Sequence, residues 1–61
     1  SDVYNSQEKE IITLSNQLSD PDFYLNDPDG FLLASENLAI ARSKLEKYEL
    51  RWLELEELKT D

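Results

Sequence analysis

Apolar residues recur with a seven-residue period over the second half of the chain. They form two rows offset by three positions: Phe31, Leu38, Leu45 and Trp52 in the first, and Ala34, Ala41, Tyr48 and Leu55 in the second. Such rows are the a and d positions of a coiled coil, whereas a straight helix of about 3.6 residues per turn drifts out of a seven-residue repeat. The pattern therefore predicts one long helix over about residues 28–59, with a seam that packs on another helix.

The first segment of the chain repeats this pattern with fewer apolar residues. Its a and d positions are Tyr4, Gln7, Ile11, Leu14 and Leu18. They predict a helix over about residues 2–18 and an all-α fold, a two-helix antiparallel coiled-coil hairpin. Antiparallel pairing of a with d positions gives the register Leu18–Ala34, Leu14–Leu38, Ile11–Ala41, Gln7–Leu45 and Tyr4–Tyr48. In this register Trp52 and Leu55 have no opposite residue.

The segment between the helices, residues 19–30, has the composition of a structured turn. It holds both prolines, the only glycine and four aspartates. Asp20 before Pro21 and Asp27 before Pro28 each fit a helix N-cap followed by proline at the first helical position. We therefore expect two capped starts in this region, the second of which begins the long helix.

The turn contains two large aromatic residues, Phe23 and Tyr24, whose side chains we do not expect to be exposed to solvent. Outside the seam of the second helix, an apolar strip lies near the turn and consists of Leu32, Leu33 and Ile40. We expect the turn to fold back so that the two rings cover this strip and close the end of the hairpin.

The composition excludes several kinds of chemistry. The 61 residues include no cysteine and no histidine, which excludes disulfides, thiol or imidazole catalysis and the usual zinc ligand sets. Aligning Gly30 with the sixth position of an EF-hand loop puts Leu25, which cannot bind calcium, at the first. We therefore interpret the aspartates as caps, and we predict no catalytic residue, metal site or cofactor in this chain. No apolar stretch is long enough to cross a membrane, and no signal-peptide pattern opens the chain.

Charge is distributed unevenly along the sequence. The net charge is −8, yet four of the six basic residues fall within ten positions. These four, the basic cluster, are Arg42, Lys44, Lys47 and Arg51. They could follow the phosphates of a nucleic acid, or they could form ion pairs with Glu8, Glu10, Glu46, Glu49 and Glu54. The antiparallel register predicts two such pairs between the helices, Glu10–Lys44 and Glu8–Arg42.

Two stretches of the sequence resemble a known family. Residues 18–24, Leu-Ser-Asp-Pro-Asp-Phe-Tyr, and the Arg51-Trp52 pair before a Leu-Glu run resemble the C-terminal domain of Uup-like ABC-F ATPases. The resemblance implies a coiled-coil hairpin that follows two fused ATP-binding cassettes, with no transmembrane part, in a cytoplasmic ATPase. ATP would be the cofactor of that parent protein. The first helix is usually longer in the family and follows a basic linker, so we expect this chain to be a fragment of a larger protein.

The resemblance also implies partners. Uup-type domains are associated with DNA binding, and ABC-F proteins act on ribosomes, so the implied partner is DNA or ribosomal RNA, contacted through the basic cluster. The alternative is a protein-interaction or spacer coiled coil that contacts its own ATP-binding cassettes or another protein through the seam of the second helix. The unpaired Trp52 and Leu55 predict weak self-association of the chain.

Overall fold

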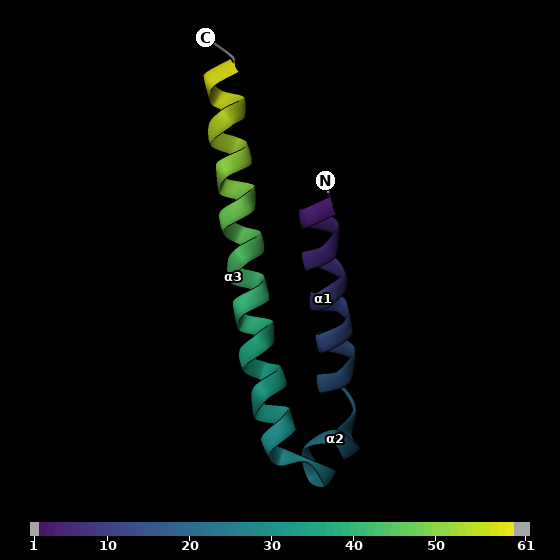
Figure 1. The fold of residues 1–61 in the computed structure, drawn as a ribbon. Helices are drawn as coiled ribbons and strands as arrows, with labels where there is room; N and C mark the ends of the chain where they lie inside the picture. Colours follow the sequence, from purple (N-terminus) through teal and green to yellow (C-terminus); the bar gives the residue numbers. More distant parts are fainter. Residues whose placement is uncertain (1, 60–61) are drawn as a thin grey trace.

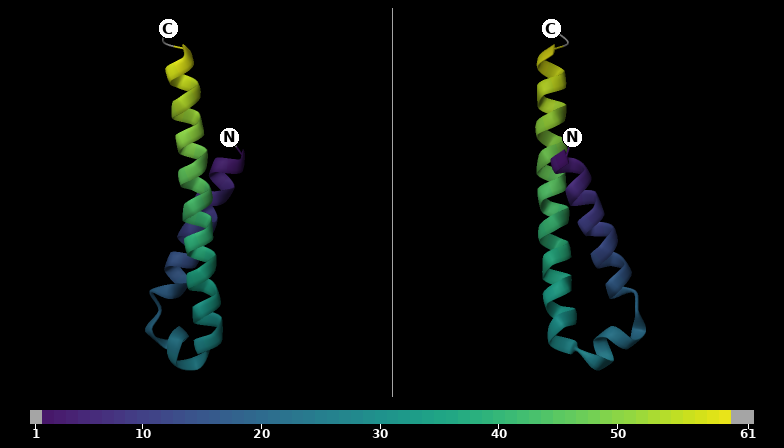
Figure 2. Two further views of the ribbon diagram at one scale, coloured as in Figure 1. Left: turned by 90° about the vertical axis from the view of Figure 1, so that its left-hand side faces the viewer. Right: turned by 45° about the vertical axis from the view of Figure 1, so that its right-hand side comes forward.

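The computed structural model describes residues 2–59, and these residues are almost entirely helical. Three helices follow one another: α1 (Asp2–Leu18), α2 (Pro21–Asn26) and α3 (Pro28–Lys59). α1 and α3 lie side by side and run in opposite directions, and the short α2 occupies the bend between them (Figure 1). Figure 2 shows that the two long helices are inclined to one another. The molecule is elongated, with extents of 55 × 16 × 14 Å.

The prediction of an all-helical chain is confirmed, since residues 2–59 contain no strand. α1 and α3 begin and end where the heptad pattern places them. The region between them differs from a simple turn because residues 21–26 form a helix of their own. Asp20 caps this helix by accepting a hydrogen bond from the backbone N–H of Asp22 at 3.0 Å, and Pro21 occupies its first turn. A cap and a pre-set proline φ favour one short helical segment even in a sequence of turn residues.

Asp27 separates α2 from α3 by serving both helices. Its backbone N–H donates to the carbonyl of Phe23 at 2.9 Å, and its own carbonyl accepts from the N–H of Phe31 at 2.9 Å. Its side chain also accepts a hydrogen bond from the N–H of Gly30 at 3.0 Å. A Cβ at position 30 would collide with the Asp27 carboxylate, so glycine fits this first turn. One residue therefore ends α2 and caps α3, and the cap on α3 is the one that the Asp27-Pro28 sequence predicts.

We expect Asp27→Ala to lower the free energy of unfolding by about 1 kcal/mol, because α3 loses the acceptor at its first turn. Urea denaturation followed by circular dichroism measures this change. Asp27→Asn is the matched control, since asparagine supplies an equivalent oxygen and should stay close to the original stability. Equal losses for alanine and asparagine would show that the carboxylate charge, and not the cap, is what matters.

The core lies along the contact between α1 and α3. Ala34 and Ala41 are 7% and 2% exposed, and they are the buried apolar residues of the described chain. The remaining seam positions of the register are half-buried, apart from Tyr48 at its open end; they are Tyr4, Gln7, Ile11, Leu14, Leu18, Leu38 and Leu45. Off the seam, Val3 and Ile12 of α1 stay exposed. Burial thus follows the heptad rows, and the two alanines allow the helices to approach closely.

The two aromatic rings of the turn pack on Phe31 and not on the expected apolar strip of α3. The rings of Phe23 and Tyr24 contact the ring of Phe31, with centroids 5.8 and 5.2 Å apart and near edge-to-face angles of 65° and 84°. The prediction that they cover the strip of Leu32, Leu33 and Ile40 is wrong, since these residues are 60%, 58% and 52% exposed. The strip lies about 100–200° around α3 from Phe31, whereas α2 packs on the side of the helix that carries Phe31.

Candidate functional site

The basic cluster lies on the middle of α3, and all four of its side chains are exposed. Helical spacing of three and four residues puts Lys44, Lys47 and Arg51 along one side of the helix. Arg42 is about 180° around the helix from Arg51. The fold therefore groups three of the four basic residues and places the fourth on the other flank.

The ion pairs that would neutralise this cluster are mostly absent. Arg51 pairs with Glu54 one turn along α3, at 3.2 Å between Nη1 and Oε2. Within residues 2–59, neither Glu10–Lys44 nor Glu8–Arg42 forms an ion pair, so the prediction of these two contacts is wrong. An exposed pair contributes only about 0–1 kcal/mol once the entropy lost by holding two long side chains in place is included, so little free energy favours either contact.

The end of the hairpin near α2 carries charge of the opposite sign. No lysine or arginine occurs between Glu10 and Arg42. The same interval contains the acidic residues Asp20, Asp22, Asp27, Asp29 and Glu36. The negative charge at this end repels other anions.

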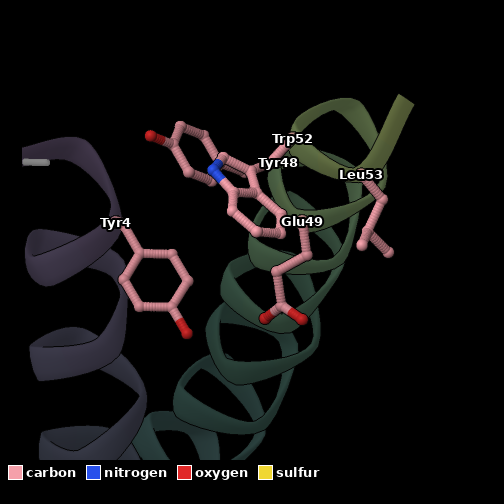
Figure 3. Close-up of a pocket in the computed structure, with 5 residues that line it drawn as sticks. All are labelled: Tyr4, Tyr48, Glu49, Trp52 and Leu53. Carbon is pink, nitrogen blue, oxygen red and sulfur yellow. The ribbon is translucent and has the colours of Figure 1, made fainter. Parts of the chain in front are cut away.

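A pocket of about 420 Å³ lies between the first turns of α1 and the facing part of α3 (Figure 3). The longer α3 continues past the start of α1 (Figure 1). Tyr4 of α1 forms one wall. The opposite wall comes from α3 and consists of Tyr48, Glu49, Trp52 and Leu53. The rings of Tyr4 and Tyr48 are 5.8 Å apart with an angle of 46° between their planes, which places them in the last layer of the predicted register. The register identified Trp52 as unpaired, and its side chain is 55% exposed. The heptad pattern did not predict a pocket here, because Glu49 and Leu53 lie outside the a and d rows.

The electrostatic environment of this pocket is negative. The pKa of the Tyr4 hydroxyl is raised above its ordinary value, first by the negative charge of Glu8, then by burial, and then by the charge of Glu49. A raised pKa in the folded state means that Tyr4 contributes stability while it is protonated. That contribution is complete below the pKa of unfolded tyrosine, about 10, and is lost as the pH rises through the folded value.

We expect Glu8→Gln to shift the ionisation of Tyr4 to lower pH, because this variant removes the largest charge that opposes the tyrosinate. Spectrophotometric titration of tyrosine absorbance between pH 9 and 12 (a window set by the ordinary tyrosine pKa of about 10) measures the shift. Glu36→Gln is the control, since Glu36 is an exposed residue of α3 outside the pocket. Identical titration curves for Glu8→Gln and the unchanged chain would contradict the expected result.

Two other kinds of feature are absent from residues 2–59. No group of three or more acidic, cysteine or histidine side chains there could hold a metal ion. No helix of the described chain is long and apolar enough to cross a membrane.

Comparison with known proteins gives one match. A family model described as ABC transporter C-terminal domain matches residues 5–57. The matched range contains α2, the basic cluster and most of both long helices. No curated protein and no solved structure matches the chain.

Proposed function

Because this chain belongs to the ABC transporter C-terminal domain family, we propose that it is the nucleic-acid-contacting arm of an ABC protein. The proposed fold of the arm is an antiparallel coiled-coil hairpin. The proposed parent is a cytoplasmic Uup-like ATPase of the ABC-F type, in which the cassettes bind and hydrolyse ATP. The arm itself would contribute binding and no catalysis, and its partner would be DNA or ribosomal RNA.

One observation carries this proposal: three exposed cations of the basic cluster have no ion-pair partner. Arg42, Lys44 and Lys47 form no ion pair within residues 2–59. Cations that are not neutralised within the protein are available to replace the counterions of phosphates, which is the main source of non-specific affinity for nucleic acids. The overall charge of −8 limits this affinity, so we expect the contact to be weak and independent of base sequence.

We expect binding of a DNA duplex to weaken steeply with salt. Each phosphate contact contributes a slope of about −0.9 in log affinity against log salt, so contact through the three residues that share one side of α3, Lys44, Lys47 and Arg51, gives about −2.7. Neutralising two of them in Lys44→Gln/Lys47→Gln should reduce the magnitude of this slope by about 1.8. Fluorescence anisotropy with labelled duplex DNA, and with duplex RNA of the same length, measures the slopes at several salt concentrations.

The matched control is Lys9→Gln/Lys59→Gln, which makes the same change in net charge away from the cluster. This variant should keep nearly the original slope. If both double variants lose the same affinity, binding depends on net charge alone, and the basic cluster is not an interface. Absence of binding even at low salt would contradict the proposed function.

A second candidate function, a protein-interaction or spacer coiled coil, is supported by the uncovered end of the seam. Trp52 and Leu55 are 55% and 43% exposed, and each continues one of the two apolar rows of α3. A contiguous exposed apolar patch often marks a contact with another protein. The proposed partners are the cassettes of the parent or, weakly, a second copy of this chain. Sedimentation equilibrium over a wide concentration range distinguishes self-association from a monomer.

We expect Trp52→Ala to leave the thermal stability of the dilute chain almost unchanged. Loss of a buried large aromatic residue costs about 3–5 kcal/mol, but more than half of Trp52 already faces solvent. Thermal unfolding at low concentration, followed by circular dichroism, measures the difference. A large drop in the midpoint would mean that Trp52 packs within the hairpin and that the seam ends later than the register indicates.

A further inference from the structure

We propose that one exposed side of α3 binds the same side of a second copy of this chain, with the two α3 helices antiparallel. The residues concerned, the outer row, follow one another along α3 at spacings of three and four, so they are neighbours on the helix surface. They are Asp29, Leu33, Glu36, Ile40, Lys44, Lys47 and Arg51, and all seven are exposed. At about 100° per residue the outer row stays within an arc of about 80°. It therefore forms one continuous surface that α1 does not cover.

The charges of the outer row change sign about its centre, Ile40. The acidic residues Asp29 and Glu36 come eleven and four positions before Ile40. The basic residues Arg51 and Lys44 come eleven and four positions after it. A face whose opposite charges lie at equal distances from its centre is complementary to itself when a second copy runs in the opposite direction.

Antiparallel pairing about Ile40 brings opposite charges together at two levels. Glu36 of each copy faces Lys44 of the other, and Asp29 of each copy faces Arg51 of the other. Because such a contact has two-fold symmetry, each pair occurs twice. A parallel arrangement would instead put every charge opposite its own copy, and like charges placed across a contact repel one another. The order of charges thus selects both the partner and its direction.

Apolar contact adds to these pairs at the middle of the outer row. The Ile40 side chain is 52% exposed, and the symmetry brings the two copies of it together. Leu33, which is 58% exposed, lies seven positions before Ile40, and Lys47 lies seven after it. Leu33 of each copy therefore faces Lys47 of the other, whose hydrocarbon stem covers apolar surface while its ammonium group stays in water.

The chain itself does not satisfy most of these charges. Within residues 2–59, neither Glu36 nor Lys44 forms an ion pair, and Asp29 forms none either. Arg51 pairs with Glu54 at 3.2 Å, so its contact with Asp29 has a competitor. The pair of Glu36 with Lys44 is therefore the more informative one to test.

The association is expected to be weak. Each copy has a net charge of −8, which repels a second copy, and exposed ion pairs contribute little individually. We expect a dissociation constant on the order of 1 mM. Two associated copies would hide Lys44, Lys47 and Arg51 from a nucleic acid, so the two kinds of binding exclude one another. The test below contains no nucleic acid, and its outcome is independent of the proposed function.

Sedimentation equilibrium at constant salt measures the association over about 0.05–2 mM chain, a range that includes the expected dissociation constant. Glu36→Lys should weaken it by about tenfold or more, because two attractive contacts become repulsive. This variant also makes the net charge less negative, so general repulsion alone would predict stronger association. Glu46→Lys is the matched control, since it makes the same charge change at an exposed α3 position outside the outer row and should associate at least as well as the unchanged chain. Circular dichroism checks that both variants keep their helix content.

A charge exchange between copies tests the pairing itself. Lys44→Glu alone should lose association as Glu36→Lys does. An equimolar mixture of the two variant chains should associate again, because every contact between unlike copies regains opposite charges.

Four results would overturn the proposal. The first three are an unchanged chain that stays monomeric over the whole range, equal effects of Glu36→Lys and Glu46→Lys, and a mixture that does not associate. The fourth is association that Trp52→Ala abolishes and Glu36→Lys leaves intact, which would place the contact at the end of the seam.

Discussion

Substitution of Ala41 by aspartate is expected to unfold most of the hairpin. Ala41 is 2% exposed and is the most buried residue of the contact between α1 and α3. An aspartate there would place an unpaired carboxylate against apolar side chains, at a cost of about 3–5 kcal/mol. A domain of this size has a core that supplies only about 3–5 kcal/mol of net stability. The loss should therefore be comparable to the whole free energy of unfolding.

Circular dichroism at 222 nm during thermal unfolding measures this effect. Ala39→Asp is the matched control, because Ala39 is an exposed residue of the same helix two positions away. There the change should cost only the difference in helix propensity, about 0.7 kcal/mol or less. If the two aspartate variants were equally stable, Ala41 would not lie at a close contact between the helices, and the predicted register would be wrong.

The opposite result is expected for Gln7→Leu, which should stabilise the hairpin by about 1–3 kcal/mol. Gln7 is a half-buried seam residue of α1, and its Oε1 is buried without a hydrogen-bond partner. A buried polar atom with no partner loses its hydration and gains nothing in return. Leucine has a similar size, removes this penalty and adds apolar contact to the layer that the register assigns to Leu45.

Urea denaturation provides the free energies, and Gln17→Leu is the control on an exposed position of α1. Gln17→Leu should change stability by less than about 0.5 kcal/mol. A polar residue in a coiled-coil seam also fixes register and oligomeric state at some cost in stability. We therefore expect Gln7→Leu to increase self-association, which sedimentation equilibrium detects. A destabilised Gln7→Leu would mean that the glutamine oxygen is satisfied in solution.

Much of the secondary structure follows from local sequence. The seven-residue rows define the inner faces of α1 and α3, because a helix repeats its surface nearly every seven residues whatever surrounds it. Asp20 and Asp27 cap helices through hydrogen bonds to N–H groups no more than three residues away. Such contacts depend on few neighbours, so the helix starts could be predicted. The family resemblance likewise rests on short local stretches, and the match over residues 5–57 supports the C-terminal domain of ABC proteins.

Side-chain partners across helices depended on the tertiary structure. Phe23 and Tyr24 pack on Phe31 because the folding of residues 21–26 into α2 sets the direction of both rings. The unpaired state of Lys44 could not be read from the sequence either, since several glutamates lie within reach in principle.

The basic cluster and the pocket illustrate the same division. Composition and spacing alone locate the four basic residues, and the register places Tyr4 opposite Tyr48. The pocket also brings Glu49 next to the two tyrosines and Trp52. This grouping depends on the inclination of α1 against α3 and on side chains outside the seam, which the heptad pattern does not specify. Periodicity determines which face of a helix is apolar, whereas the crossing of two helices determines which side chains meet at its end.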